Sequence, residues 1–292
     1  MKSSALVFLA AFLALAASWG GFVLAPQIQL GRTEQVKPTG GDGLYPAARP
    51  GQAAQGAQVY RSLGCVYCHS QQAQQDGIRV EVVLTEAGTN TAATLKALNS
   101  LNPELAKNGA AIFASLPQMV LQVHDATAAD APLKALQAGG GKAEVHLIPT
   151  GTDISRGWGK RRTVAQDFIY DSPVQLGSRR VGPDLANVGA RLTTEKLFRH
   201  LYAPSVEVNG SFMPAYRFLF ETHKVGSSPT SDALTLPKEL APAEGCEFVP
   251  TEDARALVAY LQSLRADAPL YEAPVTIATA KPAAATTNSP AK

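Results

Sequence analysis

Two cysteines and a histidine form the most chemically specific pattern in this 292-residue sequence. Cys65, Cys68 and His69 follow the order C-x-x-C-H, which is the attachment signature of a c-type haem. Two thiols one helical turn apart can both add to vinyl groups on one edge of a porphyrin, and the histidine that follows can ligate the iron. The sequence therefore predicts one covalently bound haem c, with His69 as an axial ligand.

The C-x-x-C part of the motif has two other chemical uses, as a redox dithiol and as half of a zinc site. The only further cysteine is Cys246, so a zinc site with four thiolates is excluded, and the sequence assigns Cys246 no role. A thioredoxin-like dithiol follows a strand, whereas a helical pattern from Ala53 to Leu63 leads into Cys65. These observations favour haem.

A second axial ligand is sought among the methionines Met1, Met119 and Met213. Met1 precedes an apolar N-terminal segment, and Met119 begins the strand-like run MVLQV. Met213 lies in the loop Gly210–Tyr216, after a helical pattern. A thioether opposite His69 favours reduced iron, as an electron carrier requires. A methionine that fills a gap in the core is the alternative.

Histidines are the other possible ligands of the iron. His124 and His146 fall in strand-like runs, whereas His200 and His223 remain weaker rivals. Met213 is therefore the predicted axial ligand opposite the histidine of the C-x-x-C-H motif.

The N-terminal segment is long and apolar, with no charge between Lys2 and Arg32. About 20 such residues cross the roughly 30 Å hydrocarbon core of a bilayer as a helix. A cleaved signal peptide is the alternative, since Leu15–Ser18 offers small residues to a peptidase. The run continues beyond the usual length of such a peptide, so residues 1–26 are predicted to be a retained single-pass anchor, with the amino terminus inside. Haem c is attached on the outer side of the bacterial inner membrane, so the haem domain is expected on the periplasmic side.

Composition sets the limits of the remaining chain. The net charge is +2, from 26 basic and 24 acidic residues, so nothing points to nucleic acid as a partner. Residues 27–51 are polar and rich in Gly and Pro, which predicts a tether. Residues 266–292 are rich in Ala, Pro and Thr, which predicts a disordered tail.

Two helical patterns lie near the ends of the region between tether and tail. The first begins at Gln52, and the second follows Thr251, a good N-cap residue with acidic side chains after it. In cytochromes c the first and last helices cross, and a small residue of one admits an aromatic residue of the other. Gly56 and Tyr260 suit that contact, although two ordinary amphipathic helices would show similar patterns.

A proline loop lies between these helices. Its sequence, Gly182-Pro183-Asp184-Leu185, resembles the G-P-x-L loop of cytochromes c. In that loop the proline carbonyl accepts the second ring N–H of the ligating histidine and fixes its orientation. Pro183 is therefore expected to hold His69.

Met213 lies 144 residues after His69, which is too far for one compact haem domain. Residues 78–149 explain the excess, because their patterns predict a two-layer β-α-α-β-α-β domain. The expected elements are a strand Ile78–Thr85, helices Thr91–Leu101 and Pro103–Leu116, a strand Met119–His124, a helix Thr127–Ala138 and a strand Ala143–Ile148. The expected fold is therefore mainly α: a transmembrane helix and a class-I-like cytochrome c domain of residues 52–77 and 150–265, interrupted by this α+β insert.

The insert itself resembles the C-terminal domain of the bacterial ribosomal stalk protein. The matching segments are Val82–Gly88, Asn90, Leu95–Ala97, Pro117 and Leu136–Gly140. The basic helix with which the stalk contacts translation factors is replaced here by Pro103–Asn108, so no ribosomal function is implied. A spacer or a subunit contact is the default expectation for this domain.

The segments that flank the insert resemble the mono-haem subunit II of cbb3-type cytochrome c oxidases. They are Tyr60–Gln72, Arg156–Asp171, Leu176–Gly189 and the Met213 loop with Phe218–Glu221. With the anchor, the resemblance covers residues 1–77, 150–222 and 251–265. The insert and the loop Thr222–Pro250 depart from the family pattern.

This resemblance implies an inner-membrane subunit of a terminal oxidase. Such a subunit passes electrons from a multi-haem (tri-haem) cytochrome c subunit toward haem b and the haem–copper centre of the catalytic subunit. No copper site is recognised in this chain, so oxygen chemistry is expected in the partner.

Four residues after the insert are candidates to hold the haem propionates. They are Arg156, Trp158, Arg161 and Arg162, and a guanidinium pairs bidentately with a carboxylate. A basic face that docks a partner or lipid headgroups is the alternative.

Two other classes of function stay open at this point. One is a free-standing, membrane-tethered electron shuttle, and the other is a haem peroxidase, which needs an open coordination position on the iron.

Overall fold

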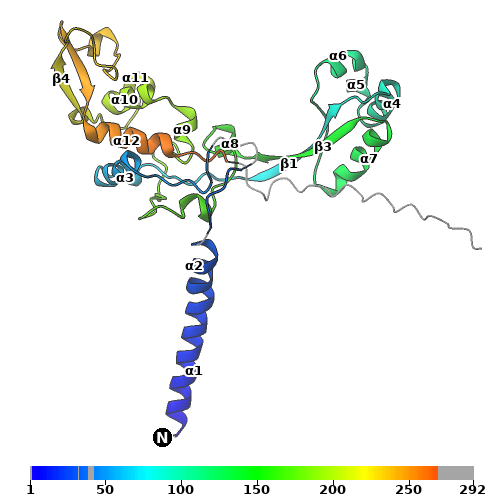
Figure 1. The fold of residues 1–292 in the computed structure, drawn as a ribbon, viewed down its shortest axis with the longest axis horizontal. Helices are drawn as coiled ribbons and strands as arrows, with labels where there is room; N and C mark the ends of the chain where they lie inside the picture. The colour runs from blue at the N-terminus through cyan, green and yellow to red at the C-terminus, as the bar shows by residue number, and fades with distance from the viewer. Residues whose placement is uncertain (1, 32, 39–42, 269–292) are drawn as a thin grey trace, which may run out of the picture. The chain divides into compact units, whose positions relative to one another are not determined.

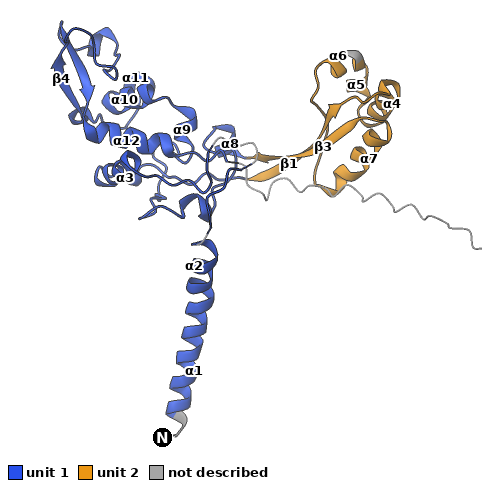
Figure 2. Cartoon of the chain, in the orientation of Figure 1, with its two compact units in different colours: residues 1–75, 151–269 blue, residues 76–150, 270–292 orange. Residues whose placement is uncertain are grey.

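The computed structural model describes residues 2–31, 33–38 and 43–268. The chain divides into two compact units, one formed by residues 1–75 and 151–269 and the other by residues 76–150 and 270–292 (Figure 2). Most of the tail expected at residues 266–292 lies outside the described residues.

The N-terminal segment is helical through Leu30 (Figure 1). It consists of α1 (Lys2–Trp19), a π-helical turn (Gly20–Leu24) and α2 (Ala25–Leu30). Ser4–Leu30 spans 27 residues, and its most apolar 18-residue window has a mean hydropathy of 2.1 and contains no buried residue. At 1.5 Å per residue this helix is about 40 Å long, enough to cross a bilayer core of roughly 30 Å. The helix has the length and composition of a membrane anchor and extends past the expected end at residue 26.

The segment that follows is bound to the first unit, although it was expected to be a tether. Val36 and Tyr45 form an antiparallel bridge. The Tyr170 hydroxyl donates to the carbonyl of Thr33 at 2.8 Å, and Arg49 forms an ion pair with Asp171.

Two crossing helices form the centre of the first unit. α3 (Gln52–Ser62) and α12 (Glu252–Ser263) lie side by side (Figure 1). A Cβ atom at Gly56 would lie 1.8 Å from the carbonyl oxygen of Ala256 and 2.7 Å from the Cβ of Tyr260, so only glycine allows this approach. The Tyr60 and Tyr260 rings pack with their centroids 5.3 Å apart. The contact expected between Gly56 and Tyr260 is therefore present.

Shorter elements complete this unit around one apolar core. They are α8 (Thr152–Ser155), α9 (Val188–Arg191), α10 (Thr194–Tyr202), α11 (Pro204–Glu207), β4 (Phe220–Lys224) and β5 (Cys246–Pro250). β4 and β5 form an antiparallel hairpin, which sequence patterns did not predict. Thr193 and Thr251 cap α10 and α12 by accepting backbone N–H groups. Leu197, Leu201 and Leu257 contribute to the buried core of this unit.

The second unit follows the expected order of strands and helices, except that three helices instead of two separate its first two strands. Its elements are β1 (Gly77–Glu86), α4 (Thr91–Leu101), α5 (Pro103–Ala106), α6 (Gly109–Ala114), β2 (Gln118–Val123), α7 (Asp130–Ala138) and β3 (Lys142–Thr150). The sheet order is β2-β1-β3, with antiparallel pairs. Val82, Leu84 and Leu136 are fully buried in its core.

Two details of this unit differ from the expectation. The helix expected over Pro103–Leu116 is divided into α5 and α6. Asn102 caps α5 by accepting the N–H of Leu105, and Gly109 begins α6. The first turn of the helix expected from Thr127 is 3₁₀.

Two expectations about the whole chain are corrected. The fold is mixed α+β and not mainly α, because each unit contains a sheet. The expected disordered tail does not begin at residue 266, since Ala266 is buried and its N–H donates to Asn187 Oδ1 at 3.0 Å. The composition of one chain segment cannot reveal a hydrogen bond to a residue far away in the sequence.

The helix crossing gives a first prediction. Gly56→Ala forces a methyl group against the backbone of α12, so the free energy of unfolding should fall by about 1–3 kcal/mol. Chemical denaturation of the detergent-solubilised chain measures this. Gly226→Ala is the matched control, because a Cβ there meets nothing within 4 Å. Equal stability of the two variants would contradict the close packing of α3 and α12.

Candidate haem site

The two thiols of the C-x-x-C-H motif follow helix α3 directly. Gly64 ends the helix with a left-handed φ of 72°, and Cys65–Tyr67 form a 3₁₀ turn. Neither cysteine forms a disulfide, and Cys68 is the more exposed of the two. Burial raises the pKa of Cys65 to about 11, so its thiol is neutral at pH 7.

His69 is oriented by the proline loop. Its Nδ1–H donates to the carbonyl oxygen of Pro183 at 2.8 Å, so Nε2 is the nitrogen available to a metal. Burial lowers the pKa of His69, and the Pro183 hydrogen bond opposes this effect. A Cβ at Gly182 would lie 2.3 Å from the His69 ring. The loop therefore needs glycine at this position to approach the imidazole.

Asp184 joins the haem-binding segment to the proline loop. Its side chain is fully buried. It accepts hydrogen bonds from the Ser70 hydroxyl at 2.5 Å, the Gln72 N–H at 2.8 Å and the Ala186 N–H at 2.8 Å. Arg180 supplies the compensating positive charge, with Nη2 3.4 Å from the carboxylate. A buried carboxylate that accepts this many hydrogen bonds holds the haem-binding segment and the proline loop together.

Two adjoining cavities of about 250 and 350 Å³ lie beside His69. Their shared lining residues are Cys65, His69, Pro183, His200, Val208 and Met213. The first cavity is otherwise mostly aliphatic, with Leu185, Val188, Leu192, Leu197, Leu201, Leu257 and Leu261 among its lining residues. The structure thus brings the expected thiol, histidine, proline and methionine together around apolar space of a size typical for a cofactor.

This arrangement fits a haem in three respects. The thiol of Cys65 and the available Nε2 of His69 belong to the same cavity wall, the thioether of Met213 lines the same space, and the remaining lining is apolar enough for a porphyrin ring.

Arg191 is a site residue that the sequence reasoning missed. It lines the first cavity, and its Nη2 donates to the backbone carbonyl of Asp184 at 2.8 Å. Its Nε is buried without a hydrogen-bond partner among the described residues, and burial lowers its pKa. A guanidinium that still has a nitrogen without a partner, beside an apolar cavity, fits a carboxylate ligand. In the sequence, only its position eight residues after Pro183 indicated that Arg191 belongs to the site.

His200 also lines both cavities. It lies on α10, and burial lowers its pKa. His200 therefore lines the same apolar space as Met213, the other candidate for the second iron ligand. His124 and His146 belong to the second unit.

The four residues proposed to hold propionates do not line either cavity. Arg161 forms a buried bidentate pair with Asp167, at 2.8 and 2.9 Å. The Arg156 guanidinium lies over the Trp158 ring, 4.9 Å from its centroid. Arg162 has its own partners in the structure. Sequence showed that three of these side chains are cationic but could not show that Arg161 pairs with Asp167 and that Arg156 lies over Trp158.

Comparison with known proteins supports the same class of site. The family described as cytochrome c oxidase, mono-haem subunit (FixO), matches residues 149–241. The match covers about a third of the chain, including the proline loop and Met213, and begins where the second unit ends. No curated protein matches the chain.

The Asp184 network gives a second prediction. Asp184→Ala leaves the Ser70 hydroxyl and the N–H groups of Gln72 and Ala186 without their acceptor, while Arg180 keeps Asp153, so unfolding free energy should fall by about 3–5 kcal/mol. Ser70→Ala, which removes only one of the donors, should cost about 1 kcal/mol. Urea titration of both variants measures the difference. A loss below 1 kcal/mol for Asp184→Ala would show that this carboxylate does not fasten the loop.

Proposed function

We propose that this chain is a membrane-anchored mono-haem cytochrome c that transfers electrons as subunit II of a cbb3-type terminal oxidase. The observation that carries the proposal is the convergence of Cys65, His69, Pro183 and Met213 on one apolar cavity. The partial match to mono-haem oxidase subunits supports the class of complex.

Each residue has a defined part in this function. Cys65 and Cys68 would hold the haem covalently, and His69 and Met213 would supply the two protein ligands of its iron. The bound haem supplies a one-electron couple. Pro183 fixes the His69 ring through Nδ1, and Arg191 pairs with a haem carboxylate. The leucines of the cavity exclude water, which favours the less charged, reduced state.

The partners follow from the family resemblance. Electrons come from a multi-haem cytochrome c subunit and pass toward the haem–copper catalytic subunit. The anchor lies in the bacterial inner membrane, with the haem unit on its periplasmic side. For the second unit, residues 76–150, we propose the spacer or subunit-contact role.

Covalent haem and its axial ligand can be tested together. Haem staining on a denaturing gel should be positive and should be lost when Cys65 and Cys68 are both changed to serine. Met213→Ala should lower the reduction potential by tenths of a volt, since axial ligands set potentials over a range of about 0.8 V. Met119→Ala is the matched control, because Met119 lies on β2 of the other unit. An unchanged potential and spectrum in Met213→Ala would refute the ligand assignment. A high-spin spectrum of the unmodified protein would instead support the peroxidase.

Assembly distinguishes the oxidase subunit from a free shuttle. Affinity purification of the full chain from mildly solubilised membranes should yield a haem–copper subunit and a multi-haem cytochrome in comparable amounts. A variant in which a short Gly-Ser link replaces residues 78–149 is purified in the same way, to test whether the second unit contributes to this assembly. Recovery of the chain alone, with its haem intact, would support the shuttle.

A further inference from the structure

Helix α10 turns one of its faces toward the candidate haem site. Leu197, His200 and Leu201 all line the first cavity, and they lie three and four positions apart, as residues on one face of a helix do. Leu197 and Leu201 are buried in the core of the first unit. His200 therefore occupies a face of α10 whose orientation its buried apolar neighbours fix.

The imidazole of His200 differs from the other imidazoles of the chain in its surroundings. The sequence contains five histidines. His69 donates to Pro183, and three others lie 3.0–3.3 Å from a neighbouring carboxylate: His124, His146 and His223. No hydrogen bond or ion pair joins the His200 ring to another described residue, and its nitrogens are not among the enclosed, unpartnered polar atoms of this part of the chain. They therefore keep accessible surface, and an imidazole nitrogen is the commonest metal ligand in proteins.

His200 also lies near both expected ligands of the iron. It lines each of the two cavities, together with His69 and Met213. Burial lowers the pKa of His200, Glu207 opposes this shift, and His69 adds to it. A charged neighbour shifts a pKa mainly at short range, so the two imidazoles lie close together beside the same space. His200 therefore lies where Met213 is expected to bind the iron.

Met213 is carried by a less constrained segment than His200. In the described part of the chain, the hydrogen bonds of residues 209–215 stay within the loop that Val208 begins, and Phe212 at its tip is 96% exposed. A segment with so few contacts to its surroundings opens at a low cost in free energy. This loop can therefore withdraw Met213 from the cavity while α10 keeps His200 in place.

We propose that His200 is a reserve ligand of the haem iron, which replaces Met213 when the Met213 loop moves away. This inference rests on the proposed haem function. In the exchange, the bond between iron and the Met213 sulfur breaks and a bond between iron and one ring nitrogen of His200 forms. The other ring nitrogen keeps its proton, and no electron is transferred. The thioether favours reduced iron, so the exchange is favoured in the oxidised state.

The reserve ligand would protect the function of an electron carrier. A haem that loses its methionine has an open coordination position, which is what a peroxidase needs. His200 closes this position to oxygen and peroxide, so the site keeps transferring electrons and does not begin oxygen chemistry of its own.

The experiment is optical and electron paramagnetic resonance spectroscopy of the oxidised, full-length chain in detergent. Met213→Ala should stay low-spin, with two nitrogen ligands. Adding His200→Ala to this variant should turn the iron high-spin and raise its rate of peroxide-dependent dye oxidation at least tenfold. Free imidazole should restore the low-spin spectrum of the double variant, which shows that its haem pocket is still folded. Met213→Ala with His223→Ala is the matched control, because His223 lies on β4 and lines neither cavity, and it should stay low-spin.

Three other outcomes would overturn the proposal. A high-spin Met213→Ala variant that still stains for haem would exclude His200 as a reserve ligand and leave the proposed haem function intact. A low-spin spectrum in the variant that lacks both Met213 and His200 would show that another group replaces the methionine. Two nitrogen ligands in the unmodified chain, lost in His200→Ala alone, would make His200 the permanent ligand. Absence of the haem stain from the unmodified chain would instead refute the proposed function itself.

Discussion

The hydrogen bonds to Asp184 are the constraint on which the haem site depends. This fully buried carboxylate accepts from Ser70, Gln72 and Ala186, and Arg180 lies beside it. Ser70 and Gln72 follow His69, whereas Arg180 and Ala186 flank Pro183, so the carboxylate links the segments of these two residues, whose own hydrogen bond is a single contact of 2.8 Å. One neutral hydrogen bond contributes only about 1 kcal/mol, too little to orient an imidazole against chain motion. The orientation of His69 therefore derives from the charged network behind the proline loop.

The same network explains how the haem unit tolerates a domain between its parts. In the host unit, Asp153 accepts the N–H of Gln74 at 2.8 Å and pairs with Arg180. In the second unit, Gly77 and Thr150 are paired at the ends of β1 and β3. Each unit therefore holds together, by its own contacts, the two chain segments at which the insert begins and ends. The entropy lost when the host loop closes depends only weakly on the number of residues inserted. The insertion therefore lowers the stability of the haem unit only slightly.

Sequence predicted those features that depend on short-range pattern. The strands of the second unit, the cap at Thr251, and the placement of His69 beside Pro183 all rest on residues close together or on a motif. Sequence did not predict the β4–β5 hairpin or the partners of the arginines. Arg161 pairs with Asp167, and Arg191 faces the cavity, yet both look alike in the sequence. Which arginine meets a ligand is decided by tertiary packing.

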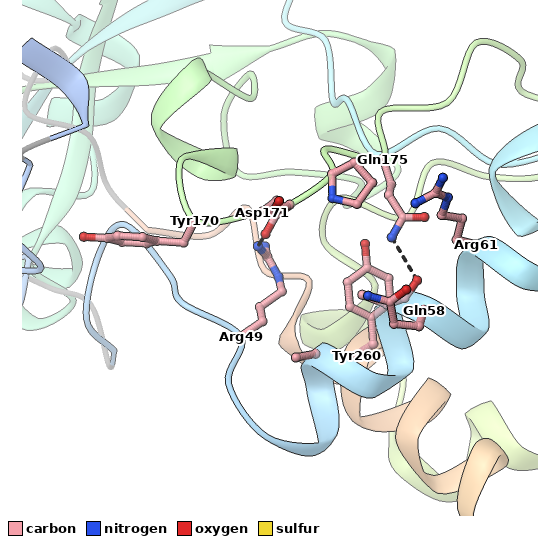
Figure 3. Close-up of a pocket in the computed structure, with 11 residues that line it drawn as sticks. Arg49, Gln58, Arg61, Tyr170, Asp171, Gln175 and Tyr260 are labelled. Atoms are coloured by element: carbon pink, nitrogen blue, oxygen red, sulfur yellow. Dashed lines mark hydrogen bonds and ion pairs between the residues drawn. The ribbon is translucent and has the colours of Figure 1, made fainter. Parts of the chain in front are cut away.

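The docked linker bears on whether this chain moves as a shuttle. A flexible linker of the length between Leu30 and Gly51 would allow excursions on the order of 25 Å. Instead, Thr33 accepts from Tyr170, Tyr45 pairs with Val36, and Arg49 pairs with Asp171. The side chains of Arg49 and Asp171 face each other (Figure 3) and are about nine-tenths buried. Burial raises the pKa of Asp171 and Arg49 opposes that shift, so Asp171 would lose its compensating cation if the linker detached. The linker between the apolar helix and the candidate haem site is thus fastened at three points, which favours the proposed oxidase subunit over the free shuttle.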